Sequence, residues 1–165
     1  MPRKTTTEPG PGFTLVELLV VLVVMAFACA MVVPMLVGMG DIQALSGARI
    51  VVSDLQYAQN AAITSQAPTT VEFAAGTVTY KLYNASGPLI HPMTNQDYNV
   101  DLSKSGLDRL SPLNAVFGTN SLKVVFDELG SPDNGGYVDV KSGPQTYRIS
   151  VAAVTGTVTY SQTAP

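Results

Sequence analysis

The stretch that decides the fold is Gly12-Phe13-Thr14-Leu15-Val16-Glu17-Leu18-Leu19-Val20-Val21-Leu22-Val23-Val24-Met25, where a polar leader ends and an apolar run begins. The run continues to Met39 and contains one charged residue, Glu17. As a helix it would be roughly 40 Å long, which is enough to cross a bilayer with some tilt. A carboxylate in hydrocarbon costs several kcal/mol, so we expect Glu17 to have a use.

The leader, residues 1–12, carries Arg3 and Lys4 ahead of the apolar run. Basic residues before such a segment hold that side of it in the cytoplasm. We therefore expect a single-pass protein of the inner membrane whose globular part lies in the periplasm.

Two ordinary export signals compete with a retained membrane helix. Ala26-Phe27-Ala28 could serve as the cleavage site of a secretory signal peptide, but Glu17 and the apolar continuation to Met39 argue against it. A lipoprotein signal ending at Cys29 would need a small residue where Phe27 stands. Cys29 is the single cysteine, so the sequence predicts a fold without an intramolecular disulfide.

Residues 12–26, GFTLVELLVVLVVMA, resemble the signal of type IV prepilins and type II secretion pseudopilins. In that family the leader ends in Gly, the mature chain opens with Phe, and its fifth residue is Glu. The resemblance implies that prepilin peptidase cuts between Gly12 and Phe13 and methylates the new amine of Phe13. It also implies that Glu17 pairs with the terminal amine of a neighbouring filament subunit, because opposite charges attract strongly at low dielectric. A Glu17 that is merely solvated near the headgroups is the alternative.

A second amphipathic segment follows, from Asp41 to about Gln66, and Pro68 ends it. Together with the apolar run it predicts one helix of about 50 residues, kinked at Pro34. The expected buried face is Leu45, Val52, Leu55, Ala58 and Ala62, and the residues expected off that face are Asp41, Gln43, Arg49, Asp54, Gln56 and Asn60.

The remainder is rich in short alternating stretches, which predict strands. Residues 69–73 and 77–83 predict a hairpin, and further strands are expected at 98–102, 122–126, 137–140, 146–151 and 157–161. Leu122, Val124 and Phe126 are expected on one face. Residues 84–99 are expected to be irregular and residues 106–120 a loop.

These elements predict an α+β fold with a long N-terminal helix packed on a C-terminal antiparallel sheet, and the resemblance implies that the fold is of the type IV pilin-like class. The expected parts are a leader (1–12), a transmembrane helix half (13–40), a soluble half of the same helix (41–66) and a periplasmic β-rich domain (67–165).

The C-terminal third contains two short motifs. Phe126-Asp127-Glu128-Leu129-Gly130-Ser131-Pro132 reads physically as a strand end and a turn, since Gly130 allows positive φ and Pro132 favours a bend. Together with Thr155-Gly156-Thr157-Val158, it resembles the C-terminal pattern of the GspH/FimT group of minor pseudopilins and minor pilins.

The sequence offers little for catalysis or ligand binding. His91 is the single histidine and is expected in a surface loop without a metal or catalytic partner. Asp127, Glu128 and Asp133 are too few to indicate a calcium site. No nucleophile–base pair, phosphate loop or Cys/His metal spacing is present, so we expect no enzyme activity, no cofactor, no metal and no small-molecule substrate.

Nucleic acid is not an expected partner either. Removing residues 1–12 leaves seven basic and eleven acidic residues, a net charge of −4. Residues 151–165 contain no Lys or Arg, whereas pilins that take up DNA use basic C-terminal residues. Phosphate binding requires a basic patch.

The resemblance therefore implies a structural H-type minor pseudopilin of a type II secretion system, assembled with other pseudopilins near the tip of a periplasmic filament. A minor pilin of a type IV pilus, serving assembly or DNA uptake, is the alternative. A membrane-anchored binding module unrelated to filaments is a third possibility, and it would make Gly12-Phe13 and Glu17 accidental.

Overall fold

The structure is a computed structural model that describes residues 12–37 and 39–163. It divides into two units, Met1–Gly38 and Met39–Pro165, each described here by itself. The expected leader therefore lies outside the described residues except for Gly12. The side chains of residues 31–41, including the predicted kink residue Pro34 and Asp41, also lie outside them.

The first unit contains the helix α1, Leu15–Val37. Its backbone continues through Pro34, and its described side chains, up to Ala30, are all exposed. Within the part of the chain that the structure describes, no helix reaches the length and hydropathy of a membrane span.

The second unit begins with α2, Met39–Ser65. The single long helix that the sequence predicts is thus described as two helices, on either side of residue 38. Residues at alternating intervals of four and three form the fully buried face of α2: Ala44, Ala48, Val51, Leu55, Ala58 and Ala62. Leu55, Ala58 and Ala62 confirm part of the predicted face, but Leu45 and Val52 lie at its margin and are only partly buried. This spacing is that of one stripe along a helix.

After α2, the described residues up to 163 form nine strands and a short 3-10 helix. They are β1 Thr69–Phe73, β2 Thr79–Asn84, β3 Gly87–Pro88, β4 Asn99–Asp101, η1 Leu102–Ser105, β5 Asn114–Phe117, β6 Lys123–Phe126, β7 Gly136–Ser142, β8 Gln145–Val151 and β9 Val158–Thr163.

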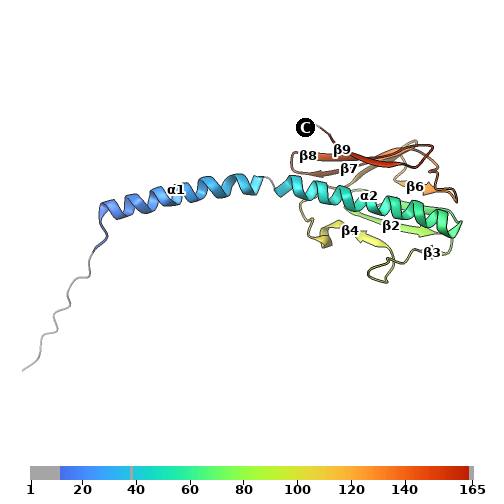
Figure 1. The fold of residues 1–165 in the computed structure, drawn as a ribbon, viewed down its shortest axis with the longest axis horizontal. Coiled ribbons are helices and arrows are strands. Elements are labelled where there is room, and N and C mark those ends of the chain that lie inside the picture. Colours follow the sequence, from blue (N-terminus) through green and yellow to red (C-terminus); the bar gives the residue numbers. More distant parts are fainter. Residues whose placement is uncertain (1–11, 38, 164–165) are drawn as a thin grey trace, which may run out of the picture. The chain divides into compact units, whose positions relative to one another are not determined.

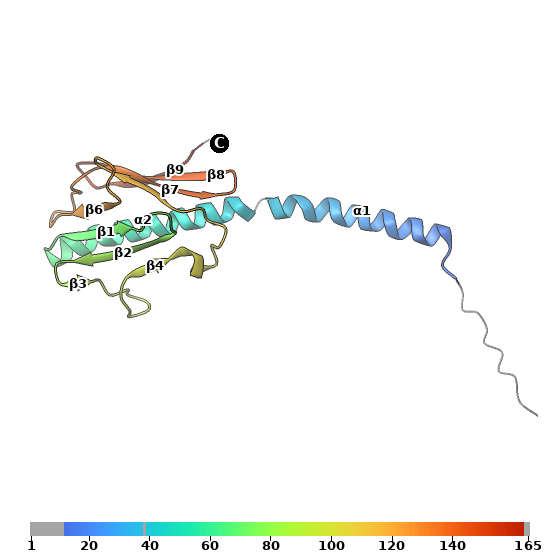
Figure 2. The same cartoon turned by 180° about the vertical axis from the view of Figure 1, so that it is seen from behind.

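The strands form two antiparallel sheets around α2 (Figures 1 and 2). The first sheet has the order β3-β2-β1-β6, with β4 also paired to β2. The second has the order β5-β7-β8-β9. The predicted hairpin is confirmed, because β1 and β2 pair with Val71 opposite Leu82 and Phe73 opposite Tyr80. Both sheets pack against α2, and the buried side chains of all three elements make one core.

Three predictions about strands were wrong. Residues 84–99, expected to be irregular, contain β3, which is a strand because β2 pairs with it, Asn84 opposite Gly87. The stretch 106–120, expected to be a loop, contains β5, whose Ala115 and Phe117 are buried in the core. Its short apolar pattern becomes a strand because β7 supplies a partner, with Ala115 opposite Val138. Leu122 lies just before β6 and is exposed, although Val124 and Phe126 are fully buried as predicted.

Candidate functional site

The predicted processing site lies at the N-terminal end of α1. Thr14 caps the helix: its Oγ1 accepts a hydrogen bond from the backbone N–H of Glu17 at 3.2 Å, and its carbonyl accepts one from the N–H of Leu18. Thr14 and Glu17 have the spacing of a capping box, a pattern visible in the sequence that the pilin resemblance alone does not use. The observed capping bond uses the backbone N–H of Glu17, and the Glu17 carboxylate stands at the position from which a capping box is completed.

Phe13 and Glu17 lie beside each other at the start of α1. Together with Leu18 and Val21 they line an open hollow of about 300 Å³. Phe13 is 81% exposed and Glu17 lies in the first helical turn, where the helix dipole favours an anion. Gly12 has open space around it, since a Cβ there would meet no heavy atom within 4 Å. The segment around the predicted cut is thus accessible, and it presents a carboxylate to solvent.

The two C-terminal motifs meet at one side chain of α2. Gln59 Nε2 donates hydrogen bonds to the carbonyl oxygens of Gly130, at 2.8 Å, and Thr155, at 3.2 Å. Gly156 has φ of +65°, and a Cβ on it would come within 2.6 Å of Gly130 O. Glycine is therefore required at Gly156 by both conformation and space. The sequence analysis missed Gln59, because nothing in its spacing distinguishes it from other polar residues of α2.

The acidic residues of the first motif build turns. Asp127 Oδ1 accepts hydrogen bonds from the N–H groups of Leu129 and Ser131, at 2.9 and 2.8 Å. Asp133 Oδ1 accepts one from the N–H of Val125 at 3.0 Å. These bonds satisfy backbone donors at a strand end and in a tight turn, so they give Asp127 and Asp133 structural roles.

A buried carboxylate lies in the core at Asp54, which was wrongly expected off the buried face of α2. Its side chain is 8% exposed and accepts hydrogen bonds from the hydroxyls of Tyr80, at 2.5 Å, and Tyr98, at 3.0 Å. Burial raises the pKa of Asp54, against the two tyrosine hydrogen bonds and the nearby His91, which lower it. Burial and the Asp54 charge in turn raise the pKa of Tyr98. The cluster ties α2 to β2 and to the segment before β4.

His91 lies in the partly exposed loop between β3 and β4, as expected for a loop residue, and it also packs against this cluster. Its ring is 4.6 Å from that of Tyr98, and its Nδ1 accepts hydrogen bonds from the N–H groups of Met93 and Thr94. In residues 12–37 and 39–163 no three His, Cys, Asp or Glu side chains are grouped so that they could hold a metal ion.

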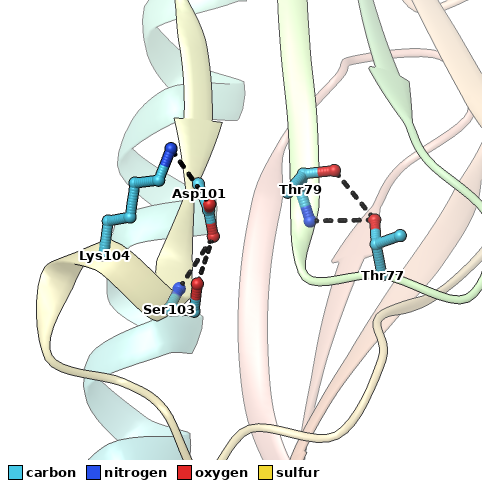
Figure 3. Close-up of polar contacts among 5 residues, drawn as sticks. All are labelled: Thr77, Thr79, Asp101, Ser103 and Lys104. Carbon is cyan, nitrogen blue, oxygen red and sulfur yellow. Dashed lines mark hydrogen bonds and ion pairs between the residues drawn. The ribbon is translucent and has the colours of Figure 1, made fainter.

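An open depression of about 410 Å³ is lined by residues of β1, β2, β4 and η1. Figure 3 shows the polar contacts of the lining residue Asp101, which accepts hydrogen bonds from the N–H and hydroxyl of Ser103 and pairs with Lys104 Nζ at 3.6 Å. These contacts, the Ser103 hydroxyl first, lower the pKa of Asp101. Another lining residue, Thr79, donates its N–H to Thr77 Oγ1, and the two hydroxyls also share a hydrogen bond. These polar groups are paired with their own neighbours and shape two turns.

A long helix followed by antiparallel sheets that wrap a second amphipathic helix defines a type IV pilin-like protein. The fold is similar to that of the minor pseudopilin EpsH from the Type 2 Secretion System of Vibrio cholerae, with a TM-score of 0.54 and 12% identity over 73% of this chain and 97% of that one. It is also similar to the type IV minor pilin FimU of Pseudomonas aeruginosa, with a TM-score of 0.51 and 14% identity over 73% of this chain and 90% of that one.

Residues 47–156 match the family model of the type II transport protein GspH, and the chain belongs to this family. Residues 11–33 match the prokaryotic N-terminal methylation motif. A comparison with curated protein sequences finds no match. The resemblance seen in the sequence is thereby confirmed, and the chain is a minor pseudopilin or type IV pilin-like protein carrying a prepilin methylation motif.

Proposed function

We propose that the chain is a structural minor pseudopilin of a type II secretion system, anchored in the inner membrane by α1 with its β domain in the periplasm. Prepilin peptidase cuts it between Gly12 and Phe13 and methylates Phe13. It then joins a filament with other pseudopilins, near the filament tip, through helix packing. Membership of the GspH family carries the proposal, and the methylation motif over residues 11–33 supports the processing step.

The mass of the N-terminal peptide tests the processing step. The protein is isolated from native membranes of cells with and without prepilin peptidase. We expect a chain that starts at methylated Phe13 only when the peptidase is present. A start near Cys29, or an uncut Met1 in both strains, would remove the filament function.

The role of Glu17 requires a variant pair, because its position three residues after Thr14 also suits the side chain to a capping box. Glu17→Gln keeps a side chain that can complete the capping box but removes the charge, whereas Glu17→Val removes both. If Glu17 pairs with a neighbour's terminal amine, both variants should be processed normally and both should be lost from co-purified pseudopilins. Wild-type recovery of Glu17→Gln would leave capping as the role of Glu17.

A minor pilin of a type IV pilus is the second candidate, supported by the similarity to FimU. The processing chemistry would be the same in both machines. Co-purification distinguishes them: with type II secretion pseudopilins the proposal stands, and with type IV pilus subunits alone it is replaced by the alternative.

A further inference from the structure

Three exposed apolar residues from separate segments flank the point where the two C-terminal motifs meet at Gln59. They are Ile63 of α2, Leu129 in the turn after β6 and Val154 in the loop between β8 and β9, and we call them the distal patch. Figures 1 and 2 both place these three segments at the end of the domain where α2 terminates.

The Gln59 hydrogen bonds hold the distal patch together. They go to the carbonyls of Gly130 and Thr155, the neighbours in sequence of Leu129 and Val154. Ile63 lies one turn after Gln59 and contacts Gly130, since its Cδ1 is 2.8 Å from where a Cβ on that glycine would lie. The patch is thus built on two loops fixed to one helix, and binding through it would lose little loop entropy.

The patch is open to solvent, although apolar surface favours burial. Leu129 is 84% exposed, Val154 79% and Ile63 46%. Single exposed apolar residues are ordinary, but a group of them on fixed loops is typical of a protein interaction site. None of the three belongs to the core that holds the sheets and α2 together.

The charges around the distal patch indicate which kind of partner it could bind. The carboxylate of Glu128 is exposed beside Leu129. The stretches that surround the three patch residues, 59–70, 126–135 and 151–158, contain no Lys or Arg. A complementary surface would therefore combine apolar side chains with a basic residue.

We propose that the distal patch binds a different subunit of the same filament, whose surface presents apolar side chains next to Lys or Arg. This inference rests on the proposed function, because it names a contact between filament subunits. A second copy fits less well: a two-fold contact would bring Glu128 against its own equivalent with no cation to pair. An anionic membrane surface would likewise repel Glu128.

Photo-crosslinking in living cells tests the proposal on the full chain. p-Benzoylphenylalanine replaces Val154, and, as a matched control, Met93, which is 88% exposed on another loop. We expect the probe at 154, and not the probe at 93, to form an adduct with a different pilin-like subunit through a peptide that contains Lys or Arg. Adding Leu129→Ser or Glu128→Lys should lower the adduct yield at 154 about fivefold or more, while Met93→Ser should leave it unchanged.

Several results would overturn the inference. The first is an adduct between two copies of this chain, and the second is an equal adduct yield from the probes at 154 and 93. The third is an adduct yield at 154 that Leu129→Ser and Glu128→Lys leave unchanged. The N-terminal peptide mass from the same cells separates this failure from failure of the proposed function. A methylated Phe13 without the expected adduct rejects the distal patch alone, whereas an uncut chain rejects the processing step whatever the adduct.

Discussion

The helices α1 and α2 are similar in length, but their apolar residues have opposite environments. In α2, six small or branched apolar residues at intervals of three and four are fully buried against two sheets. In α1, the described apolar side chains are exposed on every side of the helix. Leu15 near its start is 81% exposed, and Phe27, about three turns further on, is 73% exposed. The chain itself supplies the partner of α2, whereas within its own unit the described side chains of α1 have no partner surface.

Truncating a leucine in each helix tests whether the two helices contribute differently to the stability of the second unit. Leu55→Ala in α2 should lower the free energy of unfolding of the second unit by about 2–5 kcal/mol, because it empties a fully buried site. Leu22→Ala in α1, where the side chain is exposed, should leave it unchanged. Urea titration of the full chain in detergent measures both. Equal losses in the two variants would contradict the division of roles.

Each helix contains a carboxylate, buried in α2 at Asp54 and exposed in α1 at Glu17, and we expect only the buried one to make stability depend on pH. The pKa of Asp54 is raised above its ordinary value of 3.8, so the folded state holds the proton more tightly than the unfolded state. Stability from this group is therefore fully present below that value and is lost as pH rises through the raised pKa.

Replacing Asp54 by Asn should remove that contribution. The stability of wild type relative to Asp54→Asn should fall as pH rises from about 4 toward 7, measured by urea unfolding at each pH. The matched change in α1, Glu17→Gln, should leave the pH dependence of the second unit as it is. A wild-type-to-variant difference that stays constant with pH would show that burial does not govern Asp54.

A smaller effect is expected where α2 anchors its loops. Gly156→Ala should cost about 1–3 kcal/mol, because the added Cβ meets Gln59 and Gly130 O at a positive φ. Gly76→Ala, with φ of +70° but open space around it, isolates the conformational part of this cost and should lose less. Thermal unfolding measures the loss of stability in both variants. Equal losses would mean that the contact with Gln59 adds nothing to the cost at Gly156.

The sequence predicts most of the architecture because periodicity reports burial. The C-terminal half of the stripe on α2, the β1–β2 hairpin and β6 to β9 follow from apolar spacing and turn residues. β5 was missed because a four-residue strand becomes recognisable only beside its partner β7. Asp54 was misplaced for a related reason: a carboxylate next to Leu55 is buried only because two tyrosine hydroxyls, from sequence positions far along the chain, reach it.

The residues of the candidate site were likewise predictable where they form a local motif and not where they meet through long-range contacts. The predicted processing residues Gly12, Phe13 and Glu17 come from a local motif, which a sequence displays completely. The contact of Gly130 and Gly156 with Gln59 joins three distant segments, so each motif was visible while the side chain that unites them was not.

The order of the strands also bears on how the domain is made. β1 pairs with β6 across the long separation from Thr69 to Phe126, and β5 pairs with β7. Loop closure over such distances is slow compared with local pairing. Neither sheet can close until the last third of the chain has been synthesised, so the apolar stripe of α2 stays uncovered for most of translation. The nascent chain is therefore most prone to aggregation before β6 emerges, and the late β7–β8–β9 meander ends that exposure.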